Sequence, residues 1–219
     1  MSKKVLMLHG LGQTGDYFES KTHGFRTALE ELGYKLYYPT APHRYPAANL
    51  PDELQSTLDP SMKSAEVVAW LQNDLVKRTY ILPQETIDFL HDYIIENGPF
   101  EGVVGFSQGA GVAGYLLTDI NNLLHLTPEE QPPLKFFMAF SGFRLIPACF
   151  QKQYNKHPIS IPSLHVQGEL DTITDSKKVR ALYDCCDESN RTLLTHAGGH
   201  FVPNSRGFIK KVVEWLNSI

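Results

Sequence analysis

The stretch Glu101 to Leu116, EGVVGFSQGAGVAGYL, holds one serine, Ser107, between two glycines. The apolar run Phe100 to Val104 before it predicts a buried strand, and the small residues Gly109 to Leu117 after it predict a helix packed closely on a sheet. G-F-S-Q-G at such a junction is the pattern of a nucleophile elbow, where a tight turn exposes the serine hydroxyl above the end of a strand. Ser107 is therefore the first candidate for a catalytic residue.

Strand and helix patterns alternate along the whole chain. Short apolar runs predict further strands at 4–8, 34–39, 134–141, 163–168 and 191–196. Helical spacing and helix punctuation predict helices from Asp16 to Gly33, and near 83–98, 175–183 and 206–217. This alternation favours an α/β fold, a mostly parallel sheet of about six strands with helices on both faces.

One long connection, residues 42–80, interrupts the alternation. It contains several prolines and no sustained periodicity at its start, and loops of that length usually have a function or are disordered. Within it, SAEVVAWLQNDL, Ser64 to Leu75, predicts a short helix with an apolar side that includes Trp70. We expect the segment to act as a lid or variable region.

Length and composition limit the class of protein. The chain of 219 residues fits one domain, residues 1–219, and its net charge of −4 gives no basic field for nucleic acid. No apolar run approaches the length of a membrane span or a signal-peptide core. Cys149, Cys185 and Cys186 have no metal-ligand spacing and suit a reducing compartment. We expect a cytoplasmic protein, with a nuclear pool left open and the oligomeric state undetermined.

A serine hydroxyl needs a general base, and that base needs a carboxylate to hold its tautomer. On this scaffold the partners follow in the order serine, acid, histidine. Asp171 lies just past the predicted strand that ends in HVQG, and His200 lies in the Gly-rich loop after the last predicted strand. Glu169 and Asp175 are the rival acids, Asp175 also suiting a helix N-cap, and His196 is the rival base.

The segment LHGLGQTG, Leu8 to Gly15, is the candidate source of an oxyanion hole. A tetrahedral intermediate carries a negative oxygen, which backbone N–H groups from the first strand-to-helix loop and from the residue after the nucleophile stabilise. Leu11 and Gln108 are the expected donors, with Gly10 as a close rival. The alternative reading is that His9-Gly10 only makes a tight turn.

With these residues, the sequence resembles the fungal family of serine hydrolases, the FSH proteins, a branch of the α/β-hydrolases. The resemblance rests on ordered blocks over nearly the whole chain: VLMLHGLGQTGDYFESKTHGFR, NGPFEGVVGFSQGA, HVQGELDTI and GGHFVPNS. It implies an α/β-hydrolase fold with reduced N-terminal strands and a triad of Ser107, Asp171 and His200. It also implies hydrolysis of esters or thioesters of small acyl substrates without a cofactor.

The substrate pocket is expected to include Trp70, Phe106 and Phe201, although Trp70 also reads as an ordinary core residue. Two other function classes stay open. One is a ligand-binding protein on a hydrolase scaffold, and the other is a lactonase or peptidase that uses the same triad. A metal site is not expected, because none of the nine histidines forms an H-E-x-x-H or comparable ligand pair.

Overall fold

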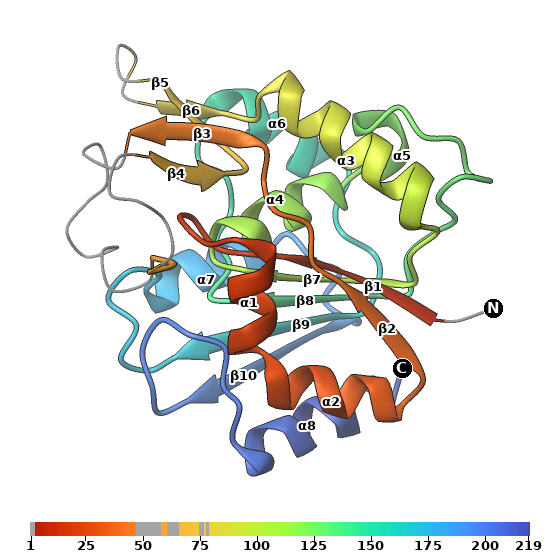
Figure 1. Cartoon of the computed structure of the whole chain (residues 1–219), viewed down its shortest axis with the longest axis vertical. Coiled ribbons are helices and arrows are strands. Elements are labelled where there is room, and N and C mark those ends of the chain that lie inside the picture. The colour runs from red at the N-terminus through yellow and green to blue at the C-terminus, as the bar shows by residue number, and fades with distance from the viewer. Residues whose placement is uncertain (1–2, 47–57, 61–65, 75–76, 78) are drawn as a thin grey trace.

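The chain forms a six-stranded parallel sheet in a computed structural model that describes residues 3–46, 58–60, 66–74, 77 and 79–219 (Figure 1). The strand order across the sheet is β10-β9-β8-β7-β1-β2, and every neighbouring pair is parallel. The strands are β1 Lys3–Leu8, β2 Tyr34–Tyr37, β7 Gly102–Phe106, β8 Phe136–Phe140, β9 Ser163–Gly168 and β10 Arg191–His196. The predicted mostly parallel sheet of about six strands is confirmed.

Helices cover both faces of this sheet. One face carries α1 Gly15–Lys21, α2 His23–Glu31 and α8 Arg206–Leu216, and the other carries α3 Gln84–Asn97, α4 Gln108–Leu116, α6 Ala148–Lys156 and α7 Ser176–Tyr183. A short helix, α5 Ile120–Leu123, follows α4. In Figure 1, α2 and α8 lie below the sheet, and α3, α4 and α6 lie above it.

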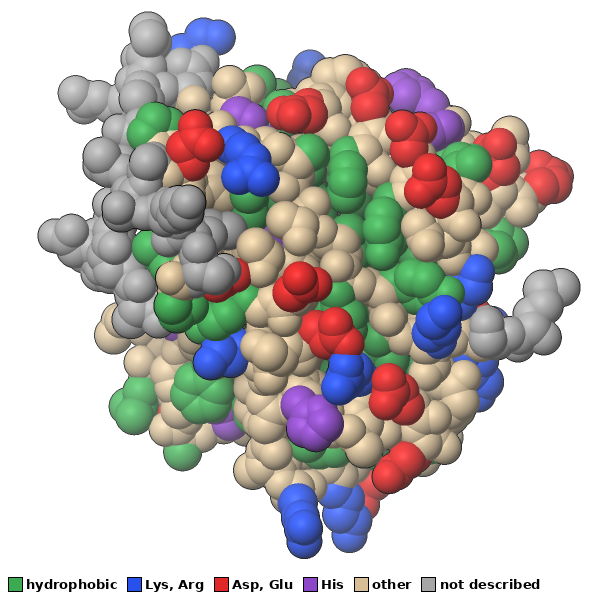
Figure 2. All heavy atoms as spheres, viewed as in Figure 1, with side chains coloured by type: hydrophobic (Ala, Val, Ile, Leu, Met, Phe, Trp, Pro, Cys, Tyr) green, Lys and Arg blue, Asp and Glu red, His purple; other side chains and the backbone are tan. Residues whose placement is uncertain are grey.

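The two faces have separate hydrophobic cores because side chains alternate along each strand. In β8, Phe136, Met138 and Phe140 pack toward α2 and α8, whereas Phe137 and Ala139 pack toward the other face. All five side chains are buried, as expected for a central parallel strand with helices on both sides. Unlike these apolar cores, the surface is charged: on the face shown in Figure 2, acidic and basic side chains are interspersed.

The structure divides the predicted helix from Asp16 to Gly33 into two. α1 is capped by the side chain of Thr14, which accepts a hydrogen bond from the Tyr17 N–H, so Asp16 lies inside the helix rather than at its cap. Thr22 ends α1, and its hydroxyl donates to the carbonyl of Phe18. Side-chain competition for backbone groups of this kind favours helix ends, which explains the break.

The helix predicted from Ser64 to Leu75 is wrong where the structure describes it. Glu66–Ala69 forms strand β4, antiparallel to β3 His43–Pro46, and Gln72–Asp74 forms β5, antiparallel to β6 Thr79–Ile81. The apolar run from Val67 to Leu71 is fully buried rather than one-sided, and β-branched residues favour strands. Much of the expected lid (47–57, 61–65, 75, 76 and 78) lies outside the described residues.

Neither a membrane helix nor a disulfide is present in the described ranges. No helix there is long and apolar enough to cross a membrane. Cys149, Cys185 and Cys186 are free thiols, two of them buried.

Because α4 packs closely against the end of β1, we expect one added methyl group at this contact to lower the stability of the protein. A Cβ added at Gly109 would lie 2.2 Å from the Leu8 carbonyl oxygen, whereas a Cβ at Gly207 in α8 would meet nothing within 4 Å. Gly109→Ala should therefore lower the free energy of unfolding by about 1–3 kcal/mol. Gly207→Ala, the matched control, should not lower it. Urea unfolding of both variants checks this, and equal stabilities would contradict the close approach.

Acid should destabilise the protein through a buried histidine in β9. Burial, with a smaller effect of Arg191, lowers the pKa of His165 to about 3. Below the ordinary histidine pKa of about 6.5 the unfolded chain binds a proton that folded His165 does not, so stability falls as pH decreases toward 3. By this linkage His165 should account for about 2 kcal/mol of the loss between pH 7 and pH 5.

Urea unfolding of His165→Gln at the two pH values measures this contribution. The variant should lose about 2 kcal/mol less than the wild type between pH 7 and pH 5, because glutamine does not titrate. His23→Gln, at an exposed position, controls for the substitution itself. An unchanged pH dependence in His165→Gln would show that His165 is not held neutral.

Candidate active site

Ser107 occupies a strained turn between β7 and α4. Its backbone angles, φ 51° and ψ −116°, lie in a region that residues with a side chain rarely adopt. A Cβ at Gly105 would lie 2.4 Å from the Ala110 Cα, and one at Gly109 would collide with the end of β1. Glycine is therefore required two residues before and two residues after the serine, which explains the two glycines of the G-x-S-x-G pattern.

Two loops at the same edge of the sheet bring an acid and a base to this serine. The Nε2 atom of His200 lies 2.9 Å from the Ser107 Oγ, and its Nδ1 atom lies 2.8 Å from an oxygen of Asp171. Asp171 follows β9 and His200 follows β10, because the carboxyl ends of parallel strands meet at one edge. The two loops are joined by the Leu170 N–H, which donates to the Gly198 carbonyl.

The carboxylate of Asp171 is fully satisfied although its side chain is buried. One oxygen accepts from the N–H groups of Ile173 and Thr174, and the other accepts from the Ser141 hydroxyl and from His200. Burial alone would raise the pKa of Asp171, but these hydrogen bonds and the nearby His200 hold it below its usual value. Asp171 is therefore an ionised partner for His200 at neutral pH.

Ser141 is the residue of this network that the sequence reasoning missed. It follows β8 directly, has a positive φ of 48°, and its hydroxyl lies 2.8 Å from the Asp171 Oδ2. The signal available in the sequence was Ser-Gly, at 141–142, at the end of a predicted strand, where active-site residues of α/β folds gather.

The rival residues have other partners. Asp175 caps α7 by accepting from the N–H groups of Lys177 and Lys178, as a helix N-cap does. Glu169 is exposed and accepts from the Thr195 hydroxyl. The Nδ1 atom of His196 accepts from the Gly198 N–H. Among the described residues, none of the three forms a hydrogen bond with Ser107 or His200.

Two backbone N–H groups at the cavity beside Ser107 have no acceptor among the described residues. They are the N–H groups of Leu11 and Gln108, and both residues border the same cavity as Ser107. The Gly10 N–H donates to the Gln13 side chain, so the rival donor is engaged. This difference favours Leu11 over Gly10.

His9 holds the loop that carries Leu11 in place through hydrogen bonds of both its ring nitrogens. Its Nε2 accepts from the Ala41 N–H, so its Nδ1 carries the proton and donates to the Gly10 carbonyl. Burial lowers the pKa of His9 to about 4, which keeps the ring neutral at neutral pH.

Trp70, one of the expected pocket residues, lies in the core and does not border the cavity next to Ser107. Its side chain is fully buried, and its Nε1 donates to the His9 carbonyl at 2.9 Å. Its backbone N–H donates to the Oε1 of Gln108 at 2.7 Å. The tryptophan thereby connects the loop that carries Leu11 with the elbow that carries Gln108.

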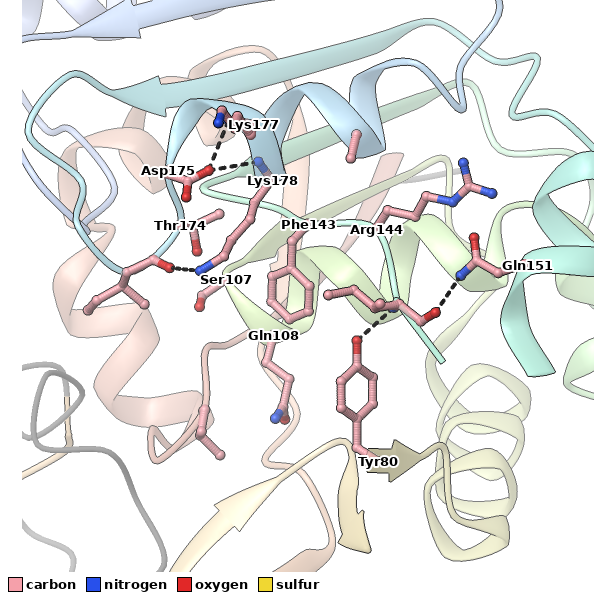
Figure 3. Close-up of a pocket in the computed structure, with 14 residues that line it drawn as sticks. Tyr80, Ser107, Gln108, Phe143, Arg144, Gln151, Thr174, Asp175, Lys177 and Lys178 are labelled. Atoms are coloured by element: carbon pink, nitrogen blue, oxygen red, sulfur yellow. Dashed lines mark hydrogen bonds between the residues drawn. The ribbon is translucent and has the colours of Figure 1, made fainter. Parts of the chain in front are cut away.

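A cavity of about 590 Å³ opens beside Ser107 and Gln108. Figure 3 shows Phe143, Tyr80 and Lys178 around this space. The other two expected pocket residues, Phe106 and Phe201, border a second cavity, next to His200. The Phe106 ring lies 4.8 Å from the His200 ring, centroid to centroid. Across the described part of the chain, no group of three or more His, Cys, Asp or Glu is placed to hold a metal ion.

Comparisons with known proteins show which family this chain matches. The family model described as "Serine hydrolase (FSH1)" matches residues 1–212. The chain is 63% identical over its full length to the full length of "Family of serine hydrolases 2" of Saccharomyces cerevisiae. It is 30% identical to "Esterase OVCA2" of Danio rerio, covering 91% of this chain and 90% of that protein.

Among solved structures, the crystal structure of Zea mays acyl-protein thioesterase 2 superposes with a TM-score of 0.61. The match covers 100% of this chain and 94% of that one at 20% sequence identity, so it bears on the fold alone. The fold is that of the α/β-hydrolases. The family match over 1–212 confirms the resemblance found in the sequence, and this chain belongs to the FSH1 family of serine hydrolases.

Proposed function

We propose that this protein hydrolyses carboxylic esters or thioesters of small acyl substrates, with Ser107, His200 and Asp171 as its catalytic triad and no cofactor. The single observation that carries the proposal is the continuous chain of hydrogen bonds from Ser107 through His200 to Asp171. In such a chain the histidine takes the serine proton while the carboxylate stabilises the imidazolium that forms. The name of the esterase relative supports ester hydrolysis.

The first step is acylation. The Ser107 Oγ attacks the substrate carbonyl carbon as His200 removes its proton, and the N–H groups of Leu11 and Gln108 stabilise the negative oxygen. His200 then gives the proton to the departing alcohol or thiol, and an acyl-serine remains. Water, activated by the same histidine, attacks the acyl-serine and releases the acid.

The same residues serve a lactonase or a peptidase, which differ in the group that the cavities accept. The relative named as an esterase favours ester hydrolysis over peptide hydrolysis. A ligand-binding protein without catalysis is disfavoured because nothing interrupts the triad: Asp171 accepts four hydrogen bonds, and both nitrogens of His200 are engaged.

Replacement of the serine tests the proposal. Ser107→Ala should lower kcat for short-chain ester and thioester hydrolysis by at least about a thousandfold, since attack by the hydroxyl is lost. Circular dichroism should show an unchanged fold. Ser189→Ala, at an exposed position, is the matched control and should keep full activity. Near-normal turnover by Ser107→Ala would refute the proposed mechanism.

Trp70 should act as a positioning residue for the oxyanion hole. Trp70→Phe keeps an aromatic ring but removes the Nε1–H that holds the His9 carbonyl, so Leu11 loses part of its support. Because donor placement matters mainly in the transition state, kcat should fall about tenfold while KM changes by less than about twofold. Trp215→Phe, in α8, is the control. A raised KM with an unchanged kcat would instead indicate a role in substrate binding.

A further inference from the structure

Two separate cavities reach the hydrogen-bonded pair of Ser107 and His200. The first, of about 590 Å³, is bordered by Ser107 and by the oxyanion donors Leu11 and Gln108, but not by His200. The second, of about 580 Å³, is bordered by His200 and not by Ser107. Only Ile173 borders both among the described lining residues. The triad therefore lies at a junction between two binding spaces.

The chemistry of acyl transfer gives each space a different part of the substrate. The carbonyl carbon must lie at the Ser107 Oγ with its oxygen toward the Leu11 and Gln108 N–H groups. The leaving atom must face His200 Nε2, which protonates it. The rest of the leaving group then extends past His200 into the second cavity, which leaves the cavity beside Ser107 for the acyl chain.

We propose that the first cavity holds the acyl group, and that the second holds a hydrophilic alcohol or thiol whose anionic substituent pairs with Lys21. This inference rests on the proposed function and names its substrate class. The reaction converts the ester or thioester and Ser107 into an acyl-serine and the free alcohol or thiol, with the serine proton passing through His200 to the leaving atom. Water then converts the acyl-serine into the free acid and restores the serine.

The first cavity suits an apolar acyl chain. Most of its wall is apolar, formed by Leu11, Tyr80, Phe143, Ile146, Ile173 and Ala181. Two of its three cationic side chains, Arg144 and Lys178, have protein partners. The Arg144 guanidinium lies 4.9 Å above the Tyr154 ring, and in Figure 3 it points away from Ser107. The Lys178 ammonium donates to the Ile173 carbonyl, and Lys177 is exposed.

The second cavity offers polar groups that are still available. Lys21, Tyr17 and Thr172 border it, and the Lys21 ammonium lies 4.9 Å from the centre of the Tyr17 ring. Within the described residues, no carboxylate pairs with Lys21, and the hydroxyls of Tyr17 and Thr172 have no hydrogen-bond partner. A cation that no carboxylate neutralises and two hydroxyls without hydrogen-bond partners favour an anionic, hydrogen-bonding leaving group over an alkyl one.

Four substrates separate the two assignments. They are butanoyl and octanoyl thioesters of mercaptoethanesulfonate, which is anionic, and of the corresponding methyl sulfone thiol, which is neutral. The variants are Lys21→Met for the second cavity and Ala181→Trp for the first, with Lys211→Met, at an exposed position of α8, as the matched control. Ala181→Met replaces Ala181→Trp if the larger side chain prevents folding. The quantity measured is kcat/KM.

The wild type should prefer the sulfonate over the sulfone by about threefold, the size expected for an exposed ion pair. Lys21→Met should remove that preference and keep the ratio of octanoyl to butanoyl rates. Ala181→Trp should lower the octanoyl to butanoyl ratio by about tenfold and keep the sulfonate preference. Lys211→Met should match the wild type in both ratios.

Either of two results would overturn the assignment. One is a sulfonate preference that survives in Lys21→Met or is absent from the wild type. The other is an Ala181→Trp enzyme that changes leaving-group preference but not chain-length preference. Equal rates for Ser107→Ala and the wild type on all four thioesters would remove the proposed function itself. The serine variant thus distinguishes failure of the mechanism from failure of the cavity assignment.

Discussion

The active-site geometry depends on the close approach of α4 to the ends of β1 and β7. Because Gly105 and Gly109 lack side chains, the chain can turn from β7 into α4 within one residue and hold Ser107 at a positive φ. Gln108 and Leu11 of the first loop border the same cavity as Ser107. A hydroxyl, two backbone donors and the end of a helix are thus brought together by one packing constraint.

The rest of the site is held by hydrogen bonds that converge on buried polar groups. Asp171 accepts from two backbone N–H groups, from Ser141 and from His200, so its charge is stabilised without exposure to water. Trp70 connects the loop after β1 with the elbow through its ring and its backbone. Such networks order a site before substrate binds, which is the condition for electrostatic stabilisation of a transition state.

Sequence patterns predicted the parts of this architecture that depend on local chemistry. Apolar runs located the six strands, and strand ends located Ser107, Asp171 and His200, which the fold brings within hydrogen-bond distance. Contacts between residues that are distant in sequence could not be predicted from these patterns. The strand β4 was predicted as part of a helix because a short apolar run that is buried throughout, Val67 to Leu71, cannot be told from a buried helix by periodicity alone; its pairing with β3 shows that it is a strand. Ser141 and the burial of Trp70 likewise follow from neighbours distant in sequence.

The central claim is that the fold activates Ser107 through His200, and covalent labelling tests it most directly. The measurement is the intact mass of the protein after exposure to a fluorophosphonate, for the wild type, Ser107→Ala and His200→Ala. The account predicts one adduct on the wild type, none on Ser107→Ala, and strongly slowed labelling of His200→Ala. No adduct on folded wild-type protein, or equal labelling of the wild type and His200→Ala, would contradict it.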